Sequence, residues 1–228
     1  FSFDVLPSSL IDNMMIYKSP SAELPADFSG GFVRVMTKNI PDGNTFNVSY
    51  QMGFNTNATF RNFQLTDGTA KDYLGFGADV RNLPSSFPAH LGEHSTDEAA
   101  AFTRQINQRW GINKFTAIPD QKISLTSHRS YDVGGWKIGN ITNLNWSTEF
   151  DYSETVNNNY IAYDVKNDVS RPRFEYNDIR YKNTSKLGAL FNWSFQRDGS
   201  KYELRNFFSQ RGVSALTQRE GMNYYSDK

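Results

Sequence analysis

Apolar and polar residues alternate with a period of two along most of the chain beyond residue 44, which places successive side chains on opposite faces of a β-strand. The clearest case covers residues 136–152, where most even positions are apolar or aromatic and most odd positions are polar. Similar or weaker alternation covers residues 45–56, 122–133, 179–197 and 201–216. The pattern predicts five strands, several of them long, each with one apolar and one polar face.

The predicted strands are joined by two kinds of connection. Residues 132–135 and 197–200 are short and contain Gly, whereas residues 57–118 and 153–177 are long and polar. Short turns at one end of a sheet and long loops at the other are typical of an outer-membrane barrel, whose short turns lie in the periplasm. A water-soluble β-sandwich also has alternating strands. It accounts less well for strands of nearly 20 residues whose polar face never becomes a second core.

The composition argues against several classes of protein. The 24 Lys and Arg residues balance 24 Asp and Glu residues, so no net charge points to nucleic acid or to an anionic membrane surface. No run of residues approaches the roughly 18 apolar residues of a membrane-spanning helix, which excludes a helical membrane protein. There is no Cys for disulfides or thiol chemistry. The chain begins at Phe1 in what reads as the middle of a segment, and we expect it to be part of a longer protein.

Residues 1–43 are different from the rest of the chain, because glycines and prolines interrupt short apolar runs in FDVLPSSLIDNMMIYKSPSAELPADFSGGFVRVMTKNIP. The order of features is a proline-led short helix (6–11), a strand ending at a Lys (14–18), a turn of small residues (19–22), the pair Gly30 and Gly31, and a strand ending in Thr-Lys (32–38). This ordered set resembles the C-terminal part of the plug domain of TonB-dependent outer-membrane receptors.

The resemblance implies a fold and a division of the chain. The fold is all-β and mainly antiparallel, a portion of a transmembrane β-barrel preceded by the end of its plug. Residues 1–43 would be the plug portion and residues 44–228 the first barrel strands, with a long outer loop at residues 57–118. Gly30 and Gly31 would be structural residues of the plug. Barrels of this family have 22 strands, and five strands cannot close a barrel.

The resemblance also implies a function, which is active uptake of a scarce nutrient such as an iron chelate, cobalamin, a glycan or a peptide. The protein would lie in the bacterial outer membrane, contact its lipid, and bind the TonB complex through a segment absent from this chain. A surface lipoprotein is a further candidate partner, and we expect no nucleic acid partner, no cofactor and no enzymatic activity. The alternatives are a passive porin-like or surface-scaffold barrel and a soluble carbohydrate-binding β-sandwich.

The sequence offers few residues for chemistry. His90, Glu93 and His94 are residue types that zinc or iron accepts as ligands, but their order differs from the H-E-x-x-H motif. We therefore interpret them as solvated loop residues. No catalytic triad or phosphate-binding loop occurs in the sequence.

Residues 95–110 have the pattern of a helix within the long loop. Ser95 and Glu98 have the spacing of a capping box, and an apolar stripe follows them. The helix either packs the loop onto the barrel rim or contributes to ligand docking. The stripe consists of Phe102, Ile106 and Trp110, and the candidate docking residues are Arg104, Arg109 and Trp110.

Other polar and aromatic residues follow the strand pattern. Six Asn-x-Ser/Thr triplets occur, at Asn47, Asn57, Asn140, Asn145, Asn183 and Asn192. Frequent Asn, Ser and Thr on a polar strand face explain them without glycans. Two aromatic girdles are predicted, from Trp136 and Trp193 near the short turns and from Tyr152, Tyr176 and Tyr181 near the long loops. Arg34 and Lys38 are candidates to pair with Glu149 or Asp151.

Overall fold

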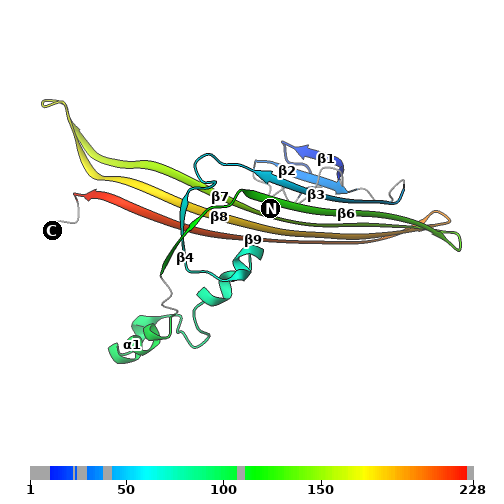
Figure 1. The fold of residues 1–228 in the computed structure, drawn as a ribbon, viewed down its shortest axis with the longest axis horizontal. Helices are drawn as coiled ribbons and strands as arrows, with labels where there is room; N and C mark the ends of the chain where they lie inside the picture. The colour runs from blue at the N-terminus through cyan, green and yellow to red at the C-terminus, as the bar shows by residue number, and fades with distance from the viewer. Residues whose placement is uncertain (1–10, 23, 25–29, 38–42, 107–110, 225–228) are drawn as a thin grey trace. The chain divides into compact units, whose positions relative to one another are not determined.

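The chain folds almost entirely into antiparallel β-strands with a single α-helix among the residues described (Figure 1). This computed structural model describes residues 11–22, 24, 30–37, 43–106 and 111–224. The strands of this part form one five-stranded sheet and two two-stranded sheets. The predicted all-β, mainly antiparallel fold is therefore confirmed.

The first two-stranded sheet joins β1 (Ile11–Tyr17) to β2 (Phe32–Thr37) in antiparallel register, with Tyr17 opposite Phe32 and Ile11 opposite Thr37. The rings of Tyr17 and Phe32 lie 6.0 Å apart, as expected for facing residues on one side of a ladder. The two strands predicted at residues 14–18 and 32–38 are thus present and pair with each other. The predicted helix at residues 6–11 lies outside the described residues, except that Ile11 begins β1.

The five-stranded sheet has the order β3-β6-β7-β8-β9, so consecutive strands of the sheet are neighbours (Figure 1). Within the described residues, β3 and β9 are its two edges. The strands are β3 (Thr45–Gly53), β6 (Asp120–Val133), β7 (Trp136–Asp164), β8 (Val169–Arg197) and β9 (Ser200–Asn223). All five predicted strands are confirmed, and β7 and β8 are each 29 residues long.

The two short turns have the backbone conformation that their residues permit. The β6–β7 turn is Gly134 and Gly135, at φ of 56° and 79°, and the β8–β9 turn is Asp198 and Gly199, at φ of 48° and 79°. Positive φ at both central residues is the requirement of a type I′ hairpin turn, which Gly meets without strain and Asp tolerates. These two turns were correctly predicted.

The prediction of a long polar loop at residues 153–177 is wrong. β7 continues to Asp164 and β8 begins at Val169, so all but a few of these residues are paired strand. Alternation fails here because both faces carry polar residues, while the ladder of backbone hydrogen bonds continues independently of side-chain polarity. Further out on this hairpin, Val156, Val165 and Val169 are more than half exposed.

The described chain divides into two compact units, and the long strands contribute residues to both. The first unit holds Phe1–Tyr50, Lys122–Trp146 and Leu187–Ser209. In it Asn143 and Asn145 of β7 are buried while Leu144 between them is 49 % exposed. In β8, Asn192 is buried while Phe191 is 45 % exposed. The buried side chains of this unit are thus mainly polar, and Ile141 and Leu190 form a small buried apolar pair beside them.

The second unit holds Gln51–Gln121, Ser147–Lys186 and Gln210–Lys228, and its core is aromatic. The ring of Phe63 is 1 % exposed and lies 5.4 Å from the ring of Phe150 and 5.2 Å from the ring of Tyr181, both edge-on. Ala58 and Ala117 complete the buried cluster. Such edge-to-face pairs add about 0.5–1.5 kcal/mol each beyond the area that they bury.

This core corrects one prediction about strand faces. The sequence alternation places Phe150 and Tyr152 on the same outer face as Leu144, yet Phe150 is only 2 % exposed and Tyr152 packs against the same core. On β7 the buried positions up to Asn145 are mostly odd, with Asn140 as the exception, whereas Thr148 and Phe150 are even. The predicted girdle of Tyr152, Tyr176 and Tyr181 is therefore wrong for Tyr152 and Tyr181, because aromatic residues of another segment cover them.

That covering segment is the β3–β6 connection (residues 54–119). Its strands β4 (Asn62–Thr66) and β5 (Ile112–Thr116) pair antiparallel, with Phe63 opposite Phe115. Between them lie three 3₁₀-helices and one α-helix. These are η3 (Ala70–Leu74), η4 (Gly77–Arg81), η5 (Leu91–Glu93) and α1 (Thr96–Arg104).

Buried asparagine side chains bond directly to the backbone of neighbouring strands. The Nδ2 atom of Asn143 donates to the carbonyl of Leu125 at 3.1 Å, and that of Asn140 donates to the carbonyl of Asn192 at 3.1 Å. Asn206 donates in the same way to the carbonyl of Phe191. Four of the six predicted triplet asparagines (Asn140, Asn145, Asn183 and Asn192) are each 7 % exposed. Their role in the described structure is to satisfy buried polar groups.

We predict that Phe63→Ala loosens the β3–β6 connection. Removing a fully buried ring from a core costs about 3–5 kcal/mol, because it loses transfer free energy and leaves a cavity. Limited proteolysis of the intact protein should cut residues 54–119 faster in this variant than in the wild type. Leu83→Ala in the same connection, where the side chain is 57 % exposed, should leave the cleavage rate unchanged. Equal rates for wild type and Phe63→Ala would contradict the assignment of Phe63 as the anchor.

Candidate functional site

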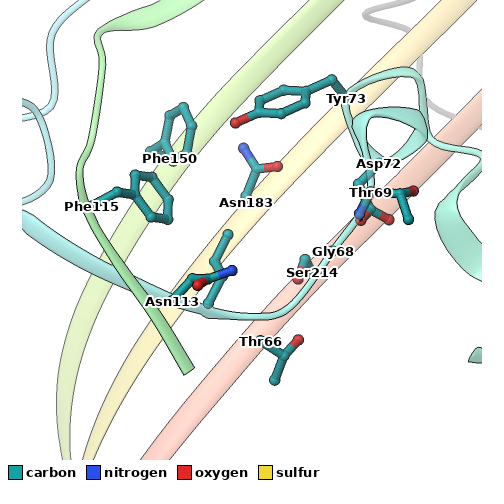
Figure 2. Close-up of a pocket in the computed structure, with 11 residues that line it drawn as sticks. Thr66, Gly68, Thr69, Asp72, Tyr73, Asn113, Phe115, Phe150, Asn183 and Ser214 are labelled. Carbon is teal, nitrogen blue, oxygen red and sulfur yellow. The ribbon is translucent and has the colours of Figure 1, made fainter. Parts of the chain in front are cut away.

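A polar cavity of about 220 Å³ lies in the second unit, between the β3–β6 connection and strands β7, β8 and β9 (Figure 2). The strands contribute one side chain each, which are Phe150, Asn183 and Ser214. Figure 2 shows Asn183 between the ring of Tyr73 and the side chains of Asn113 and Ser214. The remaining lining residues are Leu65, Thr66, Gly68, Thr69, Asp72 and Phe115.

One wall of the cavity is organised by an ion pair. Arg81 of η4 donates from Nη1 to Oδ1 of Asp72 at 2.8 Å, and from Nη2 to Oδ2 of Asp72 at 3.2 Å. Oδ2 also accepts a hydrogen bond from the backbone N–H of Thr69 at 2.7 Å. The hydrogen bond with Asp72 raises the pKa of Arg81 above its usual value. Among the described lining residues Asp72 carries the only carboxylate, and it is thus neutralised inside the wall of the cavity.

The same wall rests on β9 through a contact between two glycines. A Cβ atom at Gly212 would lie 2.6 Å from the Cα atom of Gly75, closer than atoms can approach. Gly75 has a φ of 82°, in the left-handed region that favours glycine. Gln210 completes the attachment by donating to the carbonyl of Gly75 at 2.6 Å. Two glycines therefore let the 3₁₀ segment lie directly on the strand backbone.

The cavity contains polar groups that no described residue satisfies. Asn183 is 7 % exposed, and its Nδ2 atom donates to Oγ1 of Thr148 at 3.0 Å and to the carbonyl of Glu149 at 3.1 Å. Those two hydrogen bonds fix the amide plane, and within the described residues the Oδ1 atom receives no donor. The side chains of Asn113 and Ser214 also make no hydrogen bond within this part of the chain. The arrangement presents fixed acceptors and donors without net charge.

A second cavity, of about 300 Å³, adjoins the first. Asp72, Asn183 and Ser214 line both cavities, so the two share a wall. The second cavity is lined further by residues of η4 and by residues 210–213 of β9. Its lining includes the charged side chains of Arg81 and Arg211 as well as amide and hydroxyl groups.

Gly30 and Gly31, the predicted structural residues of the plug, differ in whether the structure requires glycine at their positions. Gly30 has a φ of 92°, a conformation that side chains rarely adopt. A Cβ atom at Gly31 would meet the carbonyl oxygen of Tyr17 at 3.8 Å, an ordinary contact. Gly30 is thus required by its backbone conformation, whereas the described residues do not require glycine at position 31.

The predicted helix is shorter than residues 95–110. α1 ends at Arg104, and Ser95 caps it, with its Oγ accepting from the N–H of Glu98 and Glu98 accepting from the N–H of Ser95. The Ser95 hydroxyl, which donates to Oε2 of Glu98 at 2.9 Å, and then the Ser95 N–H lower the pKa of Glu98. The capping box is thus confirmed, while the candidate docking residues Arg109 and Trp110 lie outside the described residues.

His90 and His94 flank η5. The ring of His94 packs edge-on against Phe102 at 5.2 Å, and its Nδ1 atom lies 3.8 Å from Glu98. Within the described residues no three His, Asp or Glu side chains gather in a way that could hold a metal ion. His94 therefore packs against α1 through these contacts.

The acidic residues proposed as plug partners are paired along the sheet. Lys186 Nζ lies 3.3 Å from Oε1 of Glu149, and Lys182 Nζ lies 2.8 Å from Oδ2 of Asp151. Both pairs join β7 to β8, where opposite residues of neighbouring strands come close. Of the proposed cations, Lys38 lies outside the described residues, and no ion pair of Arg34 occurs among them.

Sequence reasoning missed the residues that line the cavity. They come from β4, β5, η3 and three strands of the sheet, and no local spacing links them. One signal was available: the apolar alternation of β8 breaks at Asn183 and Ser185, two polar residues at positions expected to be apolar. Such a break marks the place where the strand faces the β3–β6 connection.

Comparison with known protein families, curated proteins and solved structures gives no match for this chain. Among the described residues, no helix has both the length and the apolar character needed to cross a membrane.

We predict that Gly212→Ala detaches η3 and η4 from β9. The added methyl group would meet backbone atoms of Gly75, which no side-chain rotation can move away. Hydrogen–deuterium exchange of the intact protein should show faster exchange over residues 69–81. Gly92→Ala is the control, since a Cβ atom there meets nothing within 4 Å of the described structure. Unchanged exchange over residues 69–81 would show that the glycine contact does not hold the segment.

Proposed function

We propose that this chain is part of a TonB-dependent outer-membrane transporter that takes up a scarce nutrient, with residues 1–43 from its plug and residues 44–228 from its barrel. The observation that carries the proposal is the reversed polarity of the first unit. Its buried polar side chains include Asn143, Asn145 and Ser194, whereas Leu144, Phe191 and Leu204 are between 45 % and 55 % exposed.

Buried polar side chains with exposed apolar ones are expected in a lipid bilayer and are unfavourable in water. In water, a contiguous exposed apolar surface is costly and buried polar groups gain nothing from the solvent. In a lipid bilayer the outward side chains of a barrel are apolar and its interior is polar. The exposed apolar residues of β3 (Phe46, Val48 and Tyr50) extend the same surface to the edge of the sheet.

The length of the strand segments in the first unit supports the same proposal. The segments of β6, β7, β8 and β9 in this unit are residues 122–133, 136–146, 187–197 and 200–209, of 10 to 12 residues each, while β3 contributes residues 45–50. A transmembrane β-strand needs about 9–11 residues. The segments would therefore span the hydrocarbon layer.

Aromatic residues near the two short turns fit one interfacial girdle. Trp136 and Tyr202 lie 6.2 Å apart, and the guanidinium of Arg197 lies 5.7 Å from the ring of Trp136. Trp193 and Phe195 stack at 6.0 Å. Aromatic side chains with nearby cations are typical of the boundary between hydrocarbon and headgroups.

A passive porin-like barrel or a surface scaffold would share these features, whereas a soluble carbohydrate-binding sandwich would not expose the apolar face. The transporter is favoured over the passive barrel by the plug-like order of residues 1–43, in which Gly30 takes the left-handed conformation. In such a transporter, work comes from differential binding between plug states and not from covalent chemistry.

We predict that Leu144→Arg prevents stable membrane insertion while Leu83→Arg does not. Both leucines are about half exposed, so both changes would be harmless on a water-soluble protein. In a bilayer, an arginine near the midplane costs about 2–4 kcal/mol. The measurement is the amount of folded protein in the outer-membrane fraction. Equal yields for the two variants would rule out a lipid-facing position for Leu144.

The energy-coupled function is tested with the full-length protein and the purified periplasmic domain of TonB. We expect binding by interferometry, lost when the upstream TonB-contacting segment is deleted. A passive barrel would insert normally and bind no TonB domain, and that result would overturn the transporter proposal while leaving the barrel proposal intact.

A further inference from the structure

We propose that the two adjoining cavities of the second unit bind a neutral saccharide, with one sugar ring in the first cavity and a linked unit in the second. This inference concerns binding alone and does not require the transport proposal. It rests on the size of the two cavities and, in the first cavity, on the polar groups without partners, on the aromatic walls and on the paired carboxylate.

Size limits the ligand to small units. Pockets for drug-sized ligands are about 300–1,000 Å³, so the first cavity, of about 220 Å³, suits a single ring. The second cavity, of about 300 Å³, shares Asp72, Asn183 and Ser214 with the first. We therefore place the linked unit of a two-ring ligand in the second cavity, beside these three residues.

A ligand with hydroxyl groups would satisfy the polar groups of the first cavity that have no partner among the described residues. Oδ1 of Asn183 is a fixed acceptor, because its amide is held by Thr148 and by the carbonyl of Glu149. Asn113 and Ser214 add donors and acceptors that have no partner among the described residues. Each hydroxyl of a sugar both donates and accepts, so one ring can satisfy several of these groups at once.

The aromatic walls provide the complementary apolar contact. Phe115 and Phe150 lie on one side of Asn183, and the ring of Tyr73 lies on another (Figure 2). The C–H faces of a sugar ring are apolar and can pack on such rings, while its hydroxyl groups point to the amides. A pocket with apolar walls and a few convergent polar groups is the usual form of a small-molecule site.

Charge excludes acidic ligands from the first cavity. Asp72 is its only charged lining residue, and Arg81 already pairs with both oxygens of that carboxylate. An anionic chelate placed there would lose water without gaining a cation, which is strongly unfavourable. Neutral ligands face no such cost.

The test uses the intact protein purified in a polyoxyethylene detergent, because a maltoside would itself offer a sugar headgroup. Saturation-transfer NMR titrations with glucose, maltose and cellobiose measure binding, and citrate serves as the anionic probe. We expect saturable binding of at least one of the three sugars and no displacement of it by citrate. Binding of none of them, or displacement by citrate, would overturn the proposal.

Two leucine variants on neighbouring positions of β9 locate the site. Ser214→Leu fills the cavity and should weaken sugar binding about 10-fold or more. Ala215→Leu adds the same bulk at an exposed position on the opposite face of the strand and should leave binding unchanged. Asn113→Ala, at an exposed side chain without hydrogen bonds in the described structure, should also weaken binding. Unchanged binding in Ser214→Leu would overturn the assignment even if a sugar binds elsewhere.

A failure of the saccharide proposal can be told apart from a failure of the transporter proposal. A protein that binds the TonB domain but none of the sugars keeps its transport role and loses this ligand class. A protein that binds a sugar at Ser214 but no TonB domain keeps the site within a passive barrel.

Discussion

The packing of Phe63 against Phe150 and Tyr181 is the interaction on which the second unit depends. A 66-residue connection between two neighbouring strands has a large conformational entropy, and a few aromatic contacts must offset it locally. Once Phe63 is in place, the pairing of β4 with β5 follows, and the glycine contact at Gly75 positions η3 and η4. The cavity beside Asn183 is the space that remains between these attachments.

Several polar side chains of the strands bond to the backbone of a neighbouring strand. In a long strand, every N–H and C=O group must find a partner, and any irregularity in the ladder leaves one unsatisfied. Asn140, Asn143 and Asn206 supply donors to carbonyl groups on adjacent strands, and Asp120 supplies an acceptor to the N–H of Phe150 at 2.8 Å. The high content of Asn in the strands thus has a structural cause, which is more specific than a preference for polar residues on one face.

The strands and tight turns could be predicted from the sequence because both depend on local patterns. Period-two alternation identified five strands, and Gly134 and Gly199 identified their short turns. Alternation shows only which side chains of a strand are apolar. It cannot show whether such a side chain contacts lipid or another segment of the protein. Phe150 and Leu144 look alike in the sequence, yet Phe63 covers only Phe150. The extension of the β7–β8 hairpin was missed because both of its faces meet solvent.

The candidate site was beyond sequence reasoning for a different reason. Asn113, Asn183 and Ser214 are brought together by strand pairing across the sheet and by the folding of the connection, and both are contacts between residues far apart in the sequence. Only the polar interruption at Asn183 and Ser185 gave a local sign of it. By contrast, the capping box of Ser95 and Glu98 was predicted correctly because its two residues lie only three positions apart in the sequence.

The order of the large sheet has a consequence for handling the protein. Within the described residues β3 and β9 form its edges, and β9 has 24 residues whose outward N–H and C=O groups have no neighbouring strand there. Long, regular edges are templates for pairing with other chains. Produced by itself, the chain would be prone to join edge to edge into insoluble ribbons, and refolding yields would fall steeply with concentration.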